Sequence, residues 1–278
     1  MLGLFLFGCA NDENDFVITI KTEYGDMIAI LYDETPQHKA NFIKLAKAHY
    51  YDGTLFHRVI KGFMIQGGDP DSKQVGKVLG NGGPSYTIPA EINPALFHEK
   101  GALAAARLND PENPTRASSG SQFYLVQGQV MSAVEVEDLK IDQQKLGAAL
   151  RQFIQNPAHK ALRDSLALMQ KNIQIDAFQK RVIRLIPQLE KETGIKTITP
   201  VSPEKMKAYT TVGGAPFLDN QYTVFGKVIK GLNIIDKIAL LHTDNADRPV
   251  EDFAMTVSVE EMSKKRITEL YGYTYPSK

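Results

Sequence analysis

The sequence predicts a mainly β protein that carries an α-helical insertion, and two observations support this fold class. Residues 16–21 and 27–32 are rich in β-branched and aromatic side chains and flank a short turn, which is typical of a β-hairpin. In residues 130–208, by contrast, apolar side chains recur at a spacing near 3.6, which is typical of amphipathic helices. The 278 residues, 43% of them hydrophobic, can form one sizeable core and an additional subdomain.

The charges of the chain balance, with 32 Lys and Arg residues against 32 Asp and Glu residues. This balance favours neither nucleic acid nor an anionic membrane surface, so we expect a partner that is recognised by shape. The single cysteine, Cys9, excludes an intrachain disulfide and a cysteine-cluster metal site. The glycine-rich segments lack nucleotide-binding spacing, and residues 244–249 lack the glycine and distal glutamate of a calcium loop. We therefore expect no metal and no cofactor.

The N-terminus changes abruptly from apolar to polar. Residues 1–8 are apolar, residues 10–15 are polar, and residues 6–9 (LFGC) resemble the lipobox of a bacterial lipoprotein signal. This resemblance predicts that residues 1–15 are a signal remnant with a polar linker. It also implies that a lipidated Cys9 anchors the protein to a membrane of the bacterial cell envelope, facing the periplasm. The positively charged start of a signal peptide is missing, and an unprocessed Cys9 would instead lie in a short apolar tail of a cytoplasmic protein.

Further strands and two helices are predicted between residues 35 and 259. Thr35 and Pro36 provide an N-cap and a favourable first helical residue, so we expect a helix to begin there. Pro89 cannot donate to a β-ladder, which makes the strand around it an edge strand. The other predicted elements are strands at residues 101–107, 122–126 and 254–259, a helix at 231–240, and a C-terminal helical appendage at 260–278.

The stretch from residue 130 to residue 208 predicts three amphipathic helices. Residues 156–157 (NP) separate the first helix from the second, and Gly194 suits the end of the third. Pro187 is expected to kink the third helix, and Pro203 to open a further short one. The three apolar stripes comprise Leu139, Leu146, Leu150 and Phe153; Leu162, Leu166, Met169 and Ile173; and Phe178, Val182, Leu185 and Leu189.

Residues 56–69 (FHRVIKGFMIQGGD) combine polar and large apolar side chains around a glycine. In an extended segment, alternate side chains point to the same face. A bend at Gly62 can change which residues of the following segment point to that face. Such a bend brings Arg58, Phe63 and Gln66 to one surface. This combination is unlikely to arise for packing alone, and we interpret the stretch as a functional site.

This run closely resembles the signature of the cyclophilin family of peptidyl-prolyl isomerases. Residues 120–125 (GSQFYL) and 217–228 (FLDNQYTVFGKV) are similar to the second and third motifs of that family, and the three motifs occur in the expected order. The resemblance covers residues 16–129 and 209–259. It implies a closed, eight-stranded antiparallel barrel capped by two helices, with residues 130–208 as a helical insertion.

The resemblance also assigns roles to individual residues. It implies that Arg58 is catalytic, and that Gln66, Gln122 and the backbone of Ala106 and Arg107 hold the peptide. Aromatic residues replace the family's usual Phe, Trp and His at three positions of the pocket, so we expect isomerase activity to be retained and cyclosporin binding to be weaker. The proline pocket and its rim are expected to comprise Phe63, Met64, Tyr124, Phe217, Leu218 and Tyr222.

Proline isomerisation neither makes nor breaks a bond, so it requires no nucleophile and no base. Twisting the amide localises a lone pair on the prolyl nitrogen, and a guanidinium aimed at that nitrogen stabilises the twisted state selectively. The predicted function is therefore peptidyl-prolyl isomerisation that assists the folding of proline-containing envelope proteins. The alternative is a proline-peptide-binding module or holdase chaperone that acts through the groove and the helical insertion, whose partner the sequence does not identify.

Overall fold

The computed structural model describes residues 13–74 and 76–276. The chain divides into two compact units, one formed by Met1–Val130 with Thr211–Lys278 and the other by Met131–Thr210. We refer to these as the sheet unit and the helical unit. The predicted lipidation site, Cys9, lies outside the described residues.

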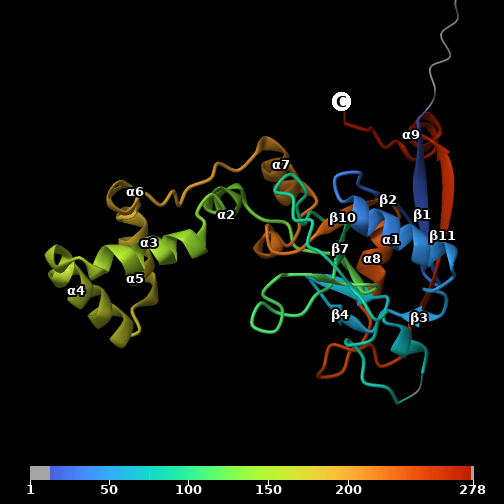
Figure 1. Ribbon diagram of the computed structural model, residues 1–278, viewed down its shortest axis with the longest axis horizontal. Helices are drawn as coiled ribbons and strands as arrows, with labels where there is room; N and C mark the ends of the chain where they lie inside the picture. Colours follow the sequence, from blue (N-terminus) through green and yellow to red (C-terminus); the bar gives the residue numbers. More distant parts are fainter. Residues whose placement is uncertain (1–12, 75, 277–278) are drawn as a thin grey trace, which may run out of the picture. The chain divides into compact units, whose positions relative to one another are not determined.

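An antiparallel sheet of nine strands forms the sheet unit, in the order β3-β11-β1-β2-β10-β7-β9-β5-β4. The predicted hairpin is present as β1 and β2, and β11, near the other end of the chain, pairs with β1 along its length. Figure 1 shows β1 and β11 side by side, β1 in blue and β11 in red. The strands are β1 (Asn14–Thr22), β2 (Gly25–Leu31), β3 (Thr54–Leu55), β4 (Arg58–Ile60), β5 (Met64–Gly67), β7 (Ala102–Ala105), β9 (Phe123–Val126), β10 (Val224–Lys230) and β11 (Ala254–Ser263).

The predicted closed eight-stranded barrel is wrong in both strand count and closure. The sheet curls strongly, but within the described residues no ladder joins its two end strands, β3 and β4. Phe56 and His57 separate these two short strands. The segment bonds instead to the loop before β11: the Phe56 N–H donates to the Phe253 carbonyl (2.9 Å), and the Val59 N–H to the Asp247 carbonyl (2.8 Å). The fold is therefore a half-barrel.

Two helices pack on the curled sheet, at the positions where the sequence predicts them. Helix α1 (Pro36–Lys47) buries Phe42 and Leu45, and α8 (Leu232–Ile238) buries Ile235, in one core with the inner face of the sheet. Residues around Pro89 lie apart from the main sheet, since β6 (Thr87–Ile88) pairs only with β8 (Ser118–Ser119) among the described strands. Short 3₁₀ helices occupy Pro70–Lys73 (η1) and Pro216–Leu218 (η3).

The C-terminal segment belongs to the sheet unit. Strand β11 continues to Ser263, four residues beyond the predicted end of the closing strand, and α9 (Lys264–Tyr271) follows it directly. Ile267 of α9 is buried in a second apolar cluster with Val17 and Ile30. This helix therefore covers apolar side chains of β1 and β2.

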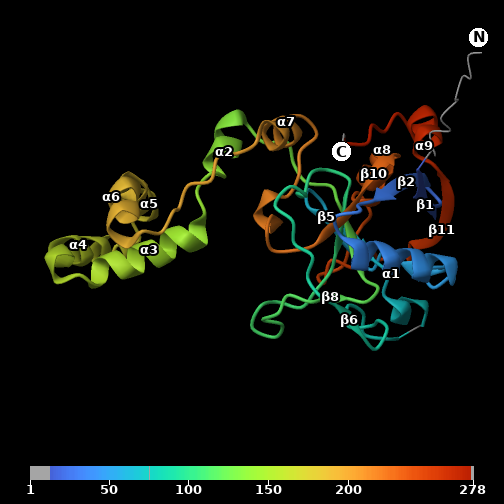
Figure 2. The same ribbon diagram turned by 45° about the horizontal axis from the view of Figure 1, so that its top comes forward.

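The helical unit contains more helices than the three that the apolar stripes predict. The third stripe is divided between α5 and α6, which meet at Leu185, because Pro187 lacks the N–H that a continuous helix needs. Gly194 ends α6 with φ +73°, as predicted. Figure 2 shows α3 to α6 packed against one another around a common core. The helices are α2 (Ala133–Asp138), α3 (Gln143–Gln155), η2 (Pro157–His159), α4 (Lys160–Lys171), α5 (Ile175–Arg184), α6 (Ile186–Thr193) and α7 (Pro203–Thr211).

Within residues 13–74 and 76–276, no helix combines the length and the apolar character that crossing a bilayer requires.

Candidate active site

The β4–β5 hairpin presents the residues that the sequence singles out. Arg58 pairs directly with Gln66 across the two strands, and the chain turns between them at Lys61 and Gly62. Gly62 has φ +78°, a conformation that favours glycine, and its N–H donates to the Gln127 side-chain oxygen (2.6 Å). The bend at Gly62 therefore brings Arg58, Phe63 and Gln66 to one cavity, as expected.

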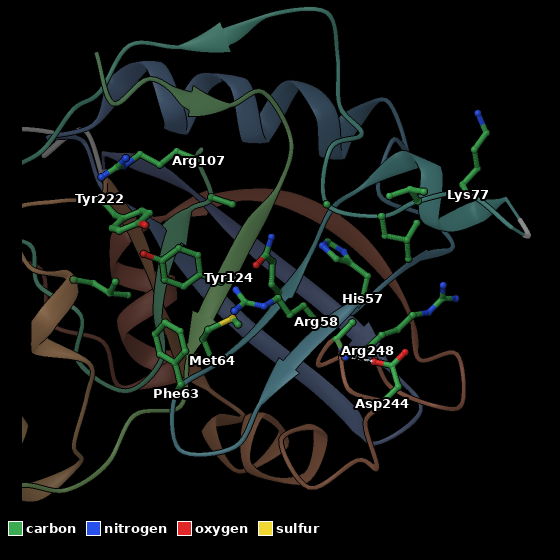
Figure 3. A pocket seen from close by; sticks show the side chains of 17 residues that line it. His57, Arg58, Phe63, Met64, Lys77, Arg107, Tyr124, Tyr222, Asp244 and Arg248 are labelled. Atoms are coloured by element: carbon green, nitrogen blue, oxygen red, sulfur yellow. Dashed lines mark hydrogen bonds between the residues drawn. The ribbon is translucent and has the colours of Figure 1, made fainter. Parts of the chain in front are cut away.

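This cavity has a volume of about 490 Å³. Figure 3 shows Arg58 in its middle, with its guanidinium directed toward Met64 and Tyr124 and with His57 and Arg248 on the opposite side. The lining includes nine residues predicted for the site, namely Arg58, Phe63, Met64, Gln66, Ala106, Arg107, Tyr124, Leu218 and Tyr222.

A loose ion pair orients Arg58. Its Nε lies 3.4 Å from Asp247 Oδ2, and both side chains are a little over 40% exposed. Such a pair contributes under about 1 kcal/mol. It directs the guanidinium but leaves it available to a ligand.

Gln122 is placed differently from the prediction, because its side chain does not line the cavity. Its Nε2 donates to the Gly82 carbonyl (2.7 Å), and its Oε1 accepts from Gln66 Nε2 (3.2 Å). Gln122 is buried, so its amide bonds to other residues of the protein and is not offered to a ligand. It therefore orients Gln66 and the loop at Gly82, and Gln66 is the glutamine that faces the cavity.

The hydroxyl of Tyr124 is held by a buried chain of polar contacts that the sequence did not reveal. It lies 3.0 Å from His98 Nε2, and His98 Nδ1 lies 3.1 Å from Asp219 Oδ1. Burial raises the pKa of Tyr124 well above its usual value, so the hydroxyl stays protonated and can donate to His98. Asp219 lies inside the third motif, and this position was the signal in the sequence that could have pointed to the contact.

Two predicted residues lie at the edges of the site. Phe217 does not line the cavity; it is 61% exposed, and its ring centroid lies 5.1 Å from that of Phe63, so it extends the rim. Ala106 lines the cavity, but its N–H donates to the Gln122 carbonyl (3.0 Å) and its carbonyl accepts from the Ser119 N–H (2.8 Å). The backbone of Ala106 is therefore largely engaged within the protein.

The far half of the cavity is polar and was not predicted. His57 is buried there, and within the described part of the chain neither of its ring nitrogens forms a hydrogen bond of good geometry. Burial lowers its pKa, so the ring is neutral near pH 7. Asp244 and Arg248 belong to a turn in which Asp244 Oδ1 accepts from the Arg248 N–H (3.0 Å). The additional lining residues are His57, Lys77, Val78, Leu79, Gly80, Asp244, Ala246 and Arg248.

The side chains that line the cavity indicate the kind of ligand that it suits. Among the described residues, no group of three or more His, Cys, Asp and Glu side chains is placed to hold a metal ion. The part of the cavity that the sequence predicts offers an apolar, partly aromatic wall with the Arg58 guanidinium and the Gln66 amide beside it. These groups suit a ligand with an apolar ring next to a polar backbone.

The family model for cyclophilin type peptidyl-prolyl cis-trans isomerase/CLD matches residues 17–137 and 204–260. The chain belongs to this family. The match includes all of the cavity-lining residues and most of the sheet unit, whereas residues 138–203 of this cyclophilin lie outside it.

Individual relatives agree with this assignment. A peptidyl-prolyl cis-trans isomerase of Staphylococcus haemolyticus is 29% identical over 252 residues, which span 90% of this chain and 93% of that relative. A protein of Streptococcus pyogenes serotype M6 that is named a bifunctional phosphatase/peptidyl-prolyl cis-trans isomerase is 30% identical over 241 residues, or 84% of this chain. The aligned part is only 36% of the streptococcal protein.

A solved structure has the same fold. The cyclophilin type peptidyl-prolyl cis-trans isomerase of Cryptosporidium parvum superposes with a TM-score of 0.52 at 20% identity, covering 89% of this chain and 98% of that one. The present cyclophilin is thus an enzyme of the peptidyl-prolyl cis-trans isomerase class with a mainly β, half-barrel fold.

Proposed function

We propose that this cyclophilin isomerises Xaa–Pro bonds in unfolded or exposed segments of envelope proteins and so assists their folding, with Arg58 as the catalytic residue. The observation that supports this role is the position of the Arg58 guanidinium, which lies in the cavity between Met64 and Tyr124 on one side and the polar half on the other. A prolyl ring seated against the apolar wall brings its nitrogen toward this guanidinium.

The chemistry follows from the electronic structure of the amide. Rotation about the Xaa–Pro bond breaks resonance, so the uncatalysed reaction takes tens to hundreds of seconds. In the twisted state the prolyl nitrogen accepts a hydrogen bond, which it does not do in the planar ground state. Arg58 donates to that nitrogen and therefore stabilises the transition state more than the ground state.

Arg58 cannot supply the whole rate enhancement. A hydrogen bond from a charged donor contributes about 1.5–3 kcal/mol, whereas an acceleration of four to five decades requires about 5.5–7 kcal/mol. The remainder comes from the cavity. Phe63, Met64 and Tyr124 exclude water around the amide, and Gln66 orients the peptide backbone.

A protease-coupled assay on a short Xaa–Pro peptide tests this function. The wild type is expected to accelerate the reaction, and Arg58→Ala to lower kcat/KM about 10- to 150-fold, the factor that corresponds to the lost hydrogen bond. Arg58→Lys keeps the charge but not the planar fork, so its activity should be intermediate. An Arg58→Ala protein with wild-type kcat/KM contradicts the assignment.

The envelope location rests on the lipobox-like residues 6–9 and remains part of this proposal. Cys9 would carry the lipid that anchors the enzyme to a membrane, with proline-containing polypeptides as its clients. Mass spectrometry of the protein purified from its native cell should find a lipid-modified cysteine at the N-terminus. An unmodified chain that begins at Met1 and occurs in the soluble fraction contradicts the anchor.

A second function, retention of unfolded clients, is favoured by a groove within the helical unit. The groove has a volume of about 720 Å³ between α3, α4 and α5 and is floored by Leu146, Leu150 and Val182. At its rim Ile173 and Ile175 are 78% and 60% exposed. The polar side chains that line the groove are mainly uncharged amides, which can form hydrogen bonds with the backbone of an apolar, unfolded segment. They are Gln143, Gln170, Gln174 and Gln179.

The two functions separate in a pair of variants. If the groove retains clients, the double variant Ile173→Glu/Ile175→Glu loses suppression of aggregation of an unfolded protein but keeps peptide isomerisation. Arg58→Ala, the matched control, should show the reverse pattern. Unchanged aggregation in the double variant contradicts a holdase role of the groove.

A further inference from the structure

Arg107 joins two loops that meet at the wall of the cavity. One is the loop that follows β7, and the other is the turn between η3 and β10. The Arg107 Nε donates to the Gln221 carbonyl (3.0 Å), and Nη1 donates to the Leu108 carbonyl (2.8 Å). Nη1 also lies 2.7 Å from Asp110 Oδ1. The guanidinium is thus fixed in both position and plane.

The ring of Tyr222 packs against this fixed guanidinium. Arg107 Cζ lies 4.4 Å from the centroid of the Tyr222 ring, within the range of a cation–π contact. Figure 3 shows the Arg107 side chain beside Tyr222 at the edge of the cavity. The Tyr222 ring also meets Tyr124 nearly edge-on, with centroids 6.0 Å apart, and Tyr124 is itself held by His98. Tyr222 is therefore held between two anchored neighbours.

The burial of Arg107 distinguishes two possible roles. Its side chain is only 3% exposed, so the guanidinium has little surface to offer to a peptide. Its donors already point at the carbonyls of Leu108 and Gln221 and at the carboxylate of Asp110. An arginine in this state fixes its neighbours and is poorly placed to bind substrate.

We propose that Arg107 is a positioning residue that holds the Tyr222 ring as a wall of the proline pocket and does not itself bind the peptide through its side chain. This inference rests on the proposed function, since it assigns Tyr222 to the pocket that receives the prolyl ring. A fixed wall binds the planar and the twisted peptide alike. Loss of this wall is therefore expected to raise KM and to leave kcat nearly unchanged.

Steady-state kinetics on a short Xaa–Pro peptide test the proposal. Arg107→Asn should raise KM about five- to tenfold, the factor that corresponds to a partly buried cation–π contact, and leave kcat within about twofold. Arg116→Asn is the matched control. Arg116 also bonds to Asp110 (2.6 Å) and to the same turn, at the Asn220 carbonyl (3.4 Å), but lines no part of the cavity, so its KM should stay within about twofold of wild type.

A double-mutant cycle with Tyr222→Ala separates positioning from direct binding. If Arg107 acts through the ring, adding Arg107→Asn to Tyr222→Ala raises KM no further. A further fivefold rise in the double variant means that Arg107 contacts the peptide and overturns the proposal. An unchanged KM in Arg107→Asn alone also overturns it.

Two additional measurements keep the outcome decisive. If Arg107→Asn does not fold, Asp110→Asn is the substitute, because it removes a partly exposed carboxylate that holds the Arg107 guanidinium. This variant should raise KM about two- to threefold. A wild-type KM in Asp110→Asn then rejects the proposal. The wild-type assay identifies failure of the underlying function, because an inactive wild type refutes isomerisation itself. A wild type that is active, with variants that are unaffected, refutes only the role of Arg107.

Discussion

Arg58 and Gln66 occupy directly opposing positions in the β4–β5 ladder, so the strand pairing fixes the spacing between the guanidinium and the amide that face the cavity. Gln66 is in turn held by Gln122, 3.2 Å away. The geometry of the site therefore depends on the register of one short hairpin. That register depends on the turn at Gly62.

Replacing Gly62 by alanine tests this dependence. Gly62 has φ +78°, which costs an L-residue about 1–2 kcal/mol, and an added Cβ would also displace the Gln129 side chain. Gly53→Ala is a matched control, because its φ is +76° but nothing lies within 4 Å of the added Cβ. Urea unfolding should show comparable destabilisation in both variants, whereas only Gly62→Ala should lower kcat/KM. Equal activity in the two variants would show that the turn does not set the site.

Asp247→Asn tests how strongly the ion pair directs Arg58. The 3.4 Å separation and the partial exposure of both groups predict a small contribution, so kcat/KM should fall by no more than about threefold. Asp247 has φ +61°, which asparagine tolerates, so the turn should be retained. A loss of more than tenfold in peptide assays would mean that the carboxylate is needed to place the guanidinium.

Two buried histidines predict a loss of stability in acid. Burial is the main cause that lowers the pKa values of His38 and His57 in the folded protein. In the unfolded chain these histidines have a pKa near 6.5, which is higher than their pKa in the folded state. Above about pH 6.5 both states bind no proton there, so the histidines do not reduce the free energy of unfolding. It decreases as the pH falls from there toward the folded pKa values, and replacing either histidine should reduce this decrease. Urea titrations of wild type and His57→Leu at pH 7.5 and 5.5 measure the difference; equal losses in the two proteins would exclude His57 as a cause.

Removal of the helical unit tests which function it serves. The sheet unit brings the two ends of this segment together, because Gln129 and Gly214 exchange backbone hydrogen bonds of 3.1 and 3.0 Å. A few glycines can therefore replace residues 131–210 without stretching the chain. The shortened protein should isomerise short peptides with kcat/KM near that of the full chain but lose any retention of unfolded clients. Loss of peptide isomerisation in a folded, shortened protein would contradict the assignment of catalysis to the sheet unit.

Local patterns in the sequence were sufficient to predict part of this structure. The β1–β2 hairpin, α1 and the shared surface of Arg58, Phe63 and Gln66 depend on alternation, on the helix-starting Pro36 and on the bend at Gly62. Each of these signals lies within about a dozen residues of the element that it predicts.

Features that depend on distant contacts were not predicted. The barrel stays open where the segment around β3 and β4 bonds to a loop almost 200 residues away in the sequence. The engagement of Gln122 with Gly82, and of Tyr124 with His98, likewise arises only when separate loops meet. The division of the third helix was signalled by Pro187, but a kink and a break have the same signature in sequence.

The central claim is that Arg58 stabilises the twisted amide and not the bound peptide in general. NMR line-shape analysis of an Xaa–Pro peptide with wild-type and Arg58→Ala protein measures the peptide Kd and the isomerisation rate on the enzyme separately. The account predicts that Kd changes by less than about twofold while the rate on the enzyme falls about 10- to 150-fold. A rise in Kd by that factor with an unchanged rate on the enzyme would contradict it.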